Sequence, residues 1–184
     1  NLARLPASVR DQLPAELDQP IRFEAGVLTL VTADPNTELF ASSTSRSVSD
    51  YGAQWLLATN CRNQVRMASS GQVSVAPGDV LIPLRQLQYR VHNHQLQVRS
   101  NAAGSYETLI EGVAGFEVSF GLAASAAKPG VQGHYVSSVD STDAGRIRSV
   151  RLALQLSDSP ADTQAAQVQP RDYTLVATLR NRSD

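Results

Sequence analysis

Three histidines, one cysteine and one lysine are the residues with most scope for catalysis or metal binding in this chain of 184 residues. His92 and His94 form a His-x-His pair, which can bind a metal when both side chains share one face of a straight strand. Here the two residues straddle an expected turn at Asn93 and have no acidic neighbour, so we expect two exposed turn histidines. His134 stands alone beside Tyr135 and is interpreted as a surface or packing residue.

The acidic segment from Asp140 to Gly145 faintly resembles a calcium-binding loop. It lacks the alternating ligands and the closing bidentate Glu of an EF-hand, so we interpret it as a solvated turn around Asp140 and Asp143. The sequence has no Gly-x-Ser-x-Gly elbow and no Gly-rich phosphate loop. The lysine, Lys128, lies in an expected loop and is a poor candidate for Schiff-base chemistry. We therefore predict no catalytic, metal or cofactor-binding residue and do not expect an enzyme.

The single cysteine, Cys61, leaves two interpretations open. A lone thiol in a globular domain is often a small buried apolar group. An odd cysteine count also fits a disulfide with a cysteine in an upstream segment. Because the chain starts at Asn1 rather than Met, we expect such a segment to be missing. A zinc site is not expected, because there is no second cysteine and no closely spaced histidine pair of the zinc-finger type.

The bulk composition is that of an ordinary globular domain. Hydrophobic residues make up 42% and charged residues 18% of the chain, and 16 basic against 17 acidic residues give a formal net charge of −1. That balance provides no positive field for nucleic acid, so none is expected to bind directly. No stretch is apolar for long enough to span a bilayer. A chain of this length suits one domain with one core.

Two parts are expected along the chain. Residues 1–20 form a short helical or irregular lead-in, because Leu2, Leu5, Val9, Leu13 and Leu17 recur at helical spacing while prolines interrupt the segment. Residues 21–184 form a strand-rich domain. Strands are expected within 27–31, 54–59, 65–75, 87–100, 108–121, 150–156 and 173–179, with a loop or edge strand at 41–50 and loops at 123–133 and 157–170. The expected fold class is α+β, mainly antiparallel β.

The clearest local pattern is a hairpin within 87–100. Leu87, Tyr89 and Val91 point to one face, and the intervening polar residues, Gln88, Arg90 and His92, point to the other. Asn93 can take a left-handed turn conformation. On the return strand Leu96 and Val98 continue the apolar face, with Gln97 and Arg99 opposite. This alternation indicates an antiparallel sheet with one face packed and one face wet.

Five segments, taken in order, resemble the PilW family of type IV pilus minor pilins. They are LLATNCR at 56–62, YRVHNHQL at 89–96, LIEGVAGFEVSFG at 109–121, IRSVRLAL at 147–154 and YTLVATLRNR at 173–182. The likeness covers about residues 54–182. The apolar N-terminal helix of such proteins is absent, as is the earlier cysteine that the family often carries before the position of Cys61.

The resemblance implies a pilin-like globular head without its N-terminal helix. The implied function is a minor pilin that joins a complex priming pilus assembly and ends at the pilus tip, with consequences for adhesion and twitching motility. Implied partners are other minor pilins, the major pilin and a tip adhesin, and the absent helix would hold the protein in the inner membrane. The implied location is the periplasm, inner membrane and pilus tip of a Gram-negative bacterium, and no cofactor is implied.

Two other functions remain open. A minor pseudopilin of type II secretion, of the GspJ kind, would have a related architecture and role. An adhesive or carbohydrate-binding β-domain would need an aromatic platform, for which an exposed Trp55 is the first requirement.

Overall fold

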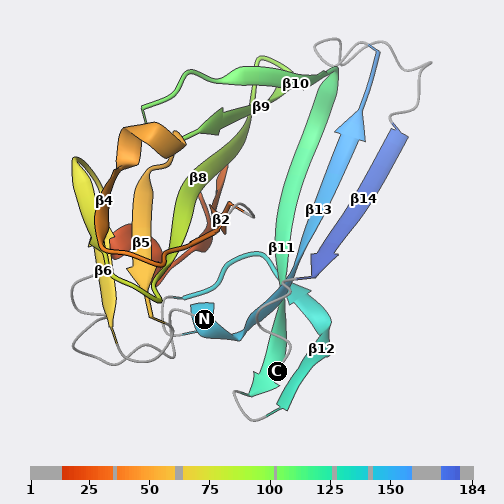
Figure 1. Cartoon of the computed structure of the whole chain (residues 1–184). Helices are drawn as coiled ribbons and strands as arrows, with labels where there is room; N and C mark the ends of the chain where they lie inside the picture. Colours follow the sequence, from red (N-terminus) through yellow and green to blue (C-terminus); the bar gives the residue numbers. More distant parts are fainter. Residues whose placement is uncertain are drawn as a thin grey trace.

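The computed structural model describes residues 14–34, 37–60, 64–101, 103–125, 128–140, 143–158 and 171–178. Strands dominate these residues and form a large sheet, a four-stranded sheet and a two-stranded sheet. Figure 1 shows the large sheet, with β2, β8 and β9, as one layer and the long strands β11, β13 and β14 as another.

The large sheet is organised around its longest strand, β8 (Val80–His92), which pairs with β2, β3, β5 and β9. All of these pairings are antiparallel. The other strands of this sheet are β1 (Ile21–Glu24), β2 (Val27–Ala33), β3 (Glu38–Leu39), β5 (Trp55–Thr59), β6 (Val65–Ala68), β9 (Gln95–Ser100) and β10 (Glu107–Glu111).

The predicted hairpin within 87–100 is confirmed as β8 and β9. His92 pairs with Gln95, and the two turn residues between them, Asn93 and His94, have φ angles of 49° and 58°. Two successive left-handed residues match the right-handed twist of the flanking strands, which is why such turns connect tight hairpins. The chain therefore enters β9 in the register that the alternating pattern requires.

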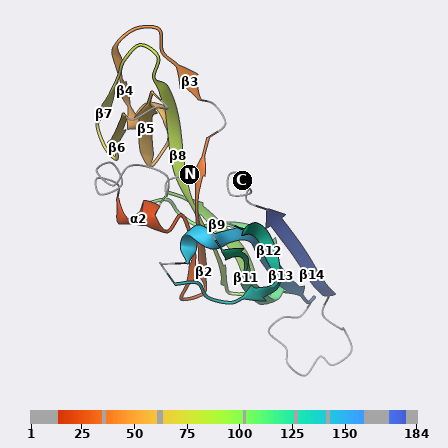
Figure 2. The ribbon, with the colours of Figure 1, turned by 90° about the horizontal axis from the view of Figure 1, so that it is seen from below.

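The four-stranded sheet has the order β12-β11-β13-β14. Figure 2 shows β14 at the outer edge of this sheet, away from β8. Its strands are β11 (Val113–Ser125), β12 (Lys128–Val136), β13 (Ile147–Leu156) and β14 (Arg171–Thr178), and the two-stranded sheet pairs β4 (Thr44–Ser47) with β7 (Gln72–Val75). The short helical turns are α2 (Ala15–Asp18), η2 (Val48–Tyr51) and η3 (Ala144–Arg146).

Buried side chains hold these layers together in three clusters. Between the large and the four-stranded sheet, Leu28 of β2 packs with Val118 and Phe120 of β11 and with neighbours from β13. A second cluster joins one face of β5 to the two-stranded sheet. On the opposite face of β5, Leu17 of α2 covers Trp55. Because β5 is covered on both sides, its apolar residues run on without alternation.

The predicted α+β, pilin-like fold is wrong. The structure is nearly all β: among the described residues, 65% lie in strands and 7% in helical turns, and none of the helices has seven residues or more. The physical reason lies in the lead-in: α2 is only four residues long, preceded by Pro14 and followed closely by Pro20, and proline does not continue a helix. From Ile21 onward the strand period takes over. Residues 1–13, where the rest of the lead-in was predicted, lie outside the described residues.

The loop predicted at 123–133 is also wrong. β11 continues to Ser125, and β12 begins at Lys128 and pairs back onto β11. Small residues with Pro129 and Gly130 favour a loop by local propensity, but pairing with a neighbouring strand overrides that preference. The register shifts twice in this hairpin, as expected where irregular backbone is forced into a ladder. Most of the loop predicted at 157–170 lies outside the described residues.

Candidate interaction surface

The strand β14 is the most exposed long element among the described residues. It pairs along its whole length with β13, from Arg171 opposite Leu156 to Thr178 opposite Ser149. Its other edge has no strand partner in the described part of the chain, and all eight of its residues are exposed. An open edge presents a row of backbone N–H and C=O groups that can pair with another strand.

The side chains of β14 are apolar where an unprotected edge is expected to be polar. Tyr173, Leu175 and Val176 are 50%, 62% and 49% exposed, and we call these three side chains the β14 patch. Proteins blunt free edges with lysine, proline or bulges. Residues 171–178 contain no lysine or proline, and their pairing with β13 runs without a register shift. The edge is therefore suited to receiving a partner.

The inner side of the β14 patch continues the packed face of its sheet. Leu175 lies opposite Leu152, which in turn lies opposite Val118 in the core between the sheets. Since side chains of directly paired residues share a face, Tyr173 and Leu175 extend the core face beyond the region that the large sheet covers. Val176 lies on the other face, so the edge strand is apolar on both sides.

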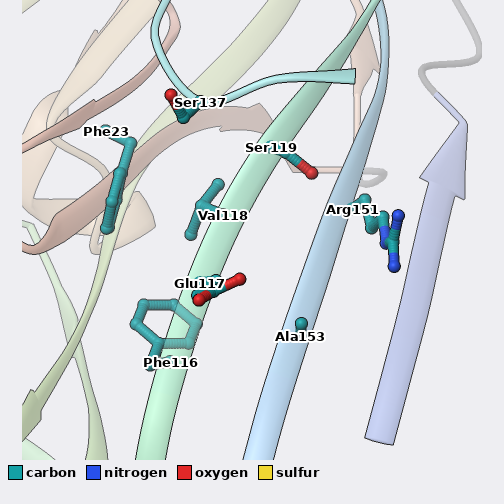
Figure 3. Close-up of a pocket in the computed structure, with 8 residues that line it drawn as sticks. All are labelled: Phe23, Phe116, Glu117, Val118, Ser119, Ser137, Arg151 and Ala153. Carbon is teal, nitrogen blue, oxygen red and sulfur yellow. The ribbon is translucent and has the colours of Figure 1, made fainter. Parts of the chain in front are cut away.

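A shallow pocket lies where the two sheets approach each other (Figure 3). Its volume is about 470 Å³, and Phe23 of β1 faces Phe116 of β11 there, edge to face, with ring centroids 6.0 Å apart. β12 pairs with β11 only from Phe120 onward, which leaves the earlier edge of β11 open at this point. The other lining residues are Glu117, Val118, Ser119, Ser137, Arg151 and Ala153.

The histidines predicted as turn or surface residues are not drawn together with acidic groups in the described structure. His92 and His134 are exposed. The ring Nδ1 of His94 lies 3.3 Å from the backbone carbonyl oxygen of Val113, so this ring packs across to the start of β11. The His-x-His pair straddles the turn, as the sequence predicts, and its members do not share a strand face.

Local contacts hold the acidic segment around Asp140 and Asp143 in a turn. The backbone N–H of Asp143 donates to the carbonyl oxygen of Asp140 at 3.0 Å, and an Asp143 carboxylate oxygen lies 2.9 Å from an Arg146 nitrogen. Ser141 and Thr142 lie outside the described residues. No group of three or more His, Cys, Asp or Glu that could hold a metal occurs among the residues described.

Two further sequence predictions concern Cys61 and Trp55. Cys61 lies outside the described residues, so both interpretations of its thiol stay predictions. Trp55 is only 2% exposed and packs beneath Leu17, which removes the aromatic platform that an adhesive domain was expected to present. Within the described residues, no helix is both apolar enough and long enough to cross a membrane.

The exposure of β14 was missed by the sequence reasoning. Alternation predicted the strand, but it also predicted that outer positions carry polar side chains. The available signal is Val176, an apolar residue at a position that the pattern assigns to the wet face. Together with Tyr173 and Leu175, Val176 indicates a strand that is apolar on both faces. A sheet that packs on only one face needs apolar side chains on that face alone.

Comparison with protein-family models, with curated proteins and with solved structures gave no significant match.

Proposed function

We propose that this chain is an assembly subunit of the minor-pilin type and that it contacts a neighbouring subunit through β14. The observation that carries the proposal is the free edge of β14 with its apolar patch, Tyr173, Leu175 and Val176. The resemblance of residues 54–182 to PilW-type minor pilins supplies the kind of partner: other minor pilins, the major pilin and a tip adhesin. A role in assembly does not depend on an α+β fold, because sheet edges make the contact.

The physics of such a contact is strand addition. A neighbour's strand pairs with the backbone of β14, and its side chains cover Leu175 on one face and Val176 on the other. Strand addition along the eight residues of β14 gives a small interface, so tethering of the two subunits raises its occupancy. Subunits held in one membrane reach a high effective concentration, and a modest interface is then occupied. Isolated domains are therefore expected to associate weakly, and membrane-held subunits strongly.

A minor pseudopilin of type II secretion would use the same kind of edge, and only the identity of the neighbours distinguishes it. The adhesive-domain alternative has no such observation in its favour, because Trp55 is buried.

The test places a lysine on the edge. Leu175→Lys and Val176→Lys add a charge that an incoming strand would have to bury, which natural edges use to prevent pairing. The matched control is Leu109→Lys on β10, because Leu109 is 53% exposed and equally apolar. All three variants are expected to keep the melting temperature of the parent, since each position is exposed.

The readout is co-purification of the full-length protein with sibling minor pilins from membranes, together with piliation of the cell. The β14 variants should lose the siblings, and Leu109→Lys should keep them. Equal recovery of siblings by β14 variants and parent would refute the proposed contact. If instead the isolated chain forms a dimer that the same variants dissociate, the partner of β14 is a second copy.

A further inference from the structure

Four polar side chains form a rectangle on the outer face of the β8–β9 hairpin. Arg90 of β8 lies directly opposite Gln97 of β9, and Gln88 lies directly opposite Arg99. Residues two apart on a strand share a face, so both arginines and both glutamines project to the same side. That side is the wet face of the hairpin, opposite the face on which Tyr89 packs toward the core.

Each arginine of the rectangle is oriented by the glutamine across from it. The Nε of Arg90 donates to the Gln97 side-chain oxygen at 3.1 Å, and the Nε of Arg99 donates to the Gln88 side-chain oxygen at 2.5 Å. The glutamines are themselves held: Gln88 donates to the Thr29 hydroxyl at 3.4 Å, and Gln97 donates to Gln95 at 3.2 Å. The two guanidinium groups are therefore positioned before any ligand arrives.

The ring of Tyr106 lies against both guanidinium groups. The central carbons of Arg90 and Arg99 are 3.6 Å and 4.7 Å from the centroid of this ring. The negative face of an aromatic ring attracts a cation, which fixes the two positive groups near each other despite their repulsion. Tyr106 and both arginines are half-buried, so they are partly shielded from water and still reachable.

The two positive charges have no acidic partner in the described structure. None of the ion pairs found among the described residues includes Arg90 or Arg99. Their Nε atoms are the only guanidinium atoms that donate to a described protein acceptor, so both Nη forks remain available. The nearest acid in the hydrogen-bond network, Glu111, instead accepts from Gln95 at 3.4 Å.

We propose that Arg90, Arg99 and Tyr106 form a binding site for a tetrahedral dianion, a sulfate or phosphate group. Two fixed charges match the two charges of such a group, and the planar forks of arginine donate paired hydrogen bonds to its oxygens. The group is either a free sulfate or phosphate ion or a phosphate monoester carried on a sugar. A phosphate monoester is also mainly a dianion at neutral pH, so the chemistry of recognition is the same in both cases. This inference is independent of the role of β14.

The experiment titrates the whole chain with inorganic sulfate, inorganic phosphate and N-acetylglucosamine 6-phosphate at constant ionic strength. Binding is followed by calorimetry and by the NMR signals of the arginine Nε–H groups. Arg90→Gln and Arg99→Gln should each weaken sulfate binding about tenfold, the loss expected when one charge-assisted pair of hydrogen bonds is removed. Arg90→Lys keeps the charge but not the fork, and it should recover only part of that loss.

The matched control is Arg151→Gln. Arg151 lies 5.8 Å from the Tyr135 ring centroid, so it forms the same kind of cation–π contact, but no second arginine stacks on that ring in the described structure. This variant should bind sulfate as the parent does. Tighter binding of the sugar phosphate than of inorganic phosphate identifies an ester as the natural ligand, and equal or weaker binding identifies the free ion.

Three outcomes overturn the proposal. Sulfate and phosphate that leave the Nε–H signals of Arg90 and Arg99 unchanged show that there is no site. An equal loss of binding in Arg151→Gln shows general attraction to positive charge. Acetate that binds as tightly as sulfate shows that a single carboxylate suffices, which contradicts the dianion.

Discussion

Asp79 is a buried carboxylate on which two different contacts depend, so its removal has a calculable effect. The residue is 1% exposed and forms an ion pair with Arg66 of β6. The same carboxylate oxygen accepts the backbone N–H of Ala76 at 2.6 Å and so closes the turn that leads into β8. Asp79→Ala leaves a guanidinium without its partner and a backbone donor without its acceptor.

The expected loss follows from these contacts. Removing one member of a buried ion pair costs about 3–5 kcal/mol. The side chain of Arg66 is 38% exposed, so water compensates part of its lost partner and the lower end, about 3 kcal/mol, applies. In a domain of this size each kcal/mol lowers the melting temperature by about 2–4 °C, so a fall of about 6–12 °C is expected. Asp79→Asn keeps an acceptor for the backbone N–H of Ala76, so its melting temperature should fall by roughly half as much.

The assay is thermal unfolding at pH 7, and Asp143→Ala is the matched control. Asp143 also pairs with an arginine, Arg146, but its side chain is 42% exposed. Exposed pairs contribute at most about 1 kcal/mol, so this variant should lose no more than about 4 °C. If the melting temperatures of Asp79→Ala and Asp143→Ala fall by the same amount, burial does not strengthen the Asp79 contacts and the reasoning is refuted.

Three further predictions concern stability. Leu17→Ala should lower the free energy of unfolding in urea by about 2–5 kcal/mol, because this side chain is 1% exposed over the face of β5. Gly112→Ala should cost more than Gly26→Ala in the same assay; both glycines have positive φ (77° and 76°), but only at Gly112 would the new Cβ lie 2.8 Å from a backbone oxygen. Burial first, and then its hydrogen bond to Glu38, raises the pKa of Tyr51 above its ordinary value of 10.0. The folded state thus favours the neutral phenol of Tyr51. The contribution of this group to the free energy of unfolding is complete below pH 10.0 and is lost as pH rises through the raised pKa. Tyr51→Phe should therefore flatten the fall in the free energy of unfolding above pH 10.0.

Local patterns predicted several of the strands. The hairpin of β8 and β9 follows from strict alternation and from Asn93 at the turn. The two short strands expected within 65–75 are present as β6 and β7. In both cases the signal lies in the segment itself, because alternation and turn residues act over a few positions.

Other features of the fold could not be predicted from the local pattern. β12 looks like a loop until β11 supplies a partner, and Tyr106 joins Arg90 and Arg99 only through the folded arrangement. The alternation within 87–100 did place Arg90 and Arg99 on one wet face, so two of the three residues of the proposed dianion site were visible in the sequence. The ring that completes the site was not, since no local rule connects Tyr106 to that face.

The central position of β8 determines the order in which the chain can fold. Its side chains meet those of β2 across a separation of 59 residues, as between Gln88 and Thr29, and it also carries β5. A ribosome or a translocation channel delivers the N-terminal end first, so β1 with β2, and β5 with β6, emerge as hairpins before their common partner. Closing such long loops slows folding, and unpaired strands are open to misassociation while they wait. We therefore expect β2 and β5 to complete their pairing with β8 only after His92 has emerged, and the chain to be most open to misassociation until then.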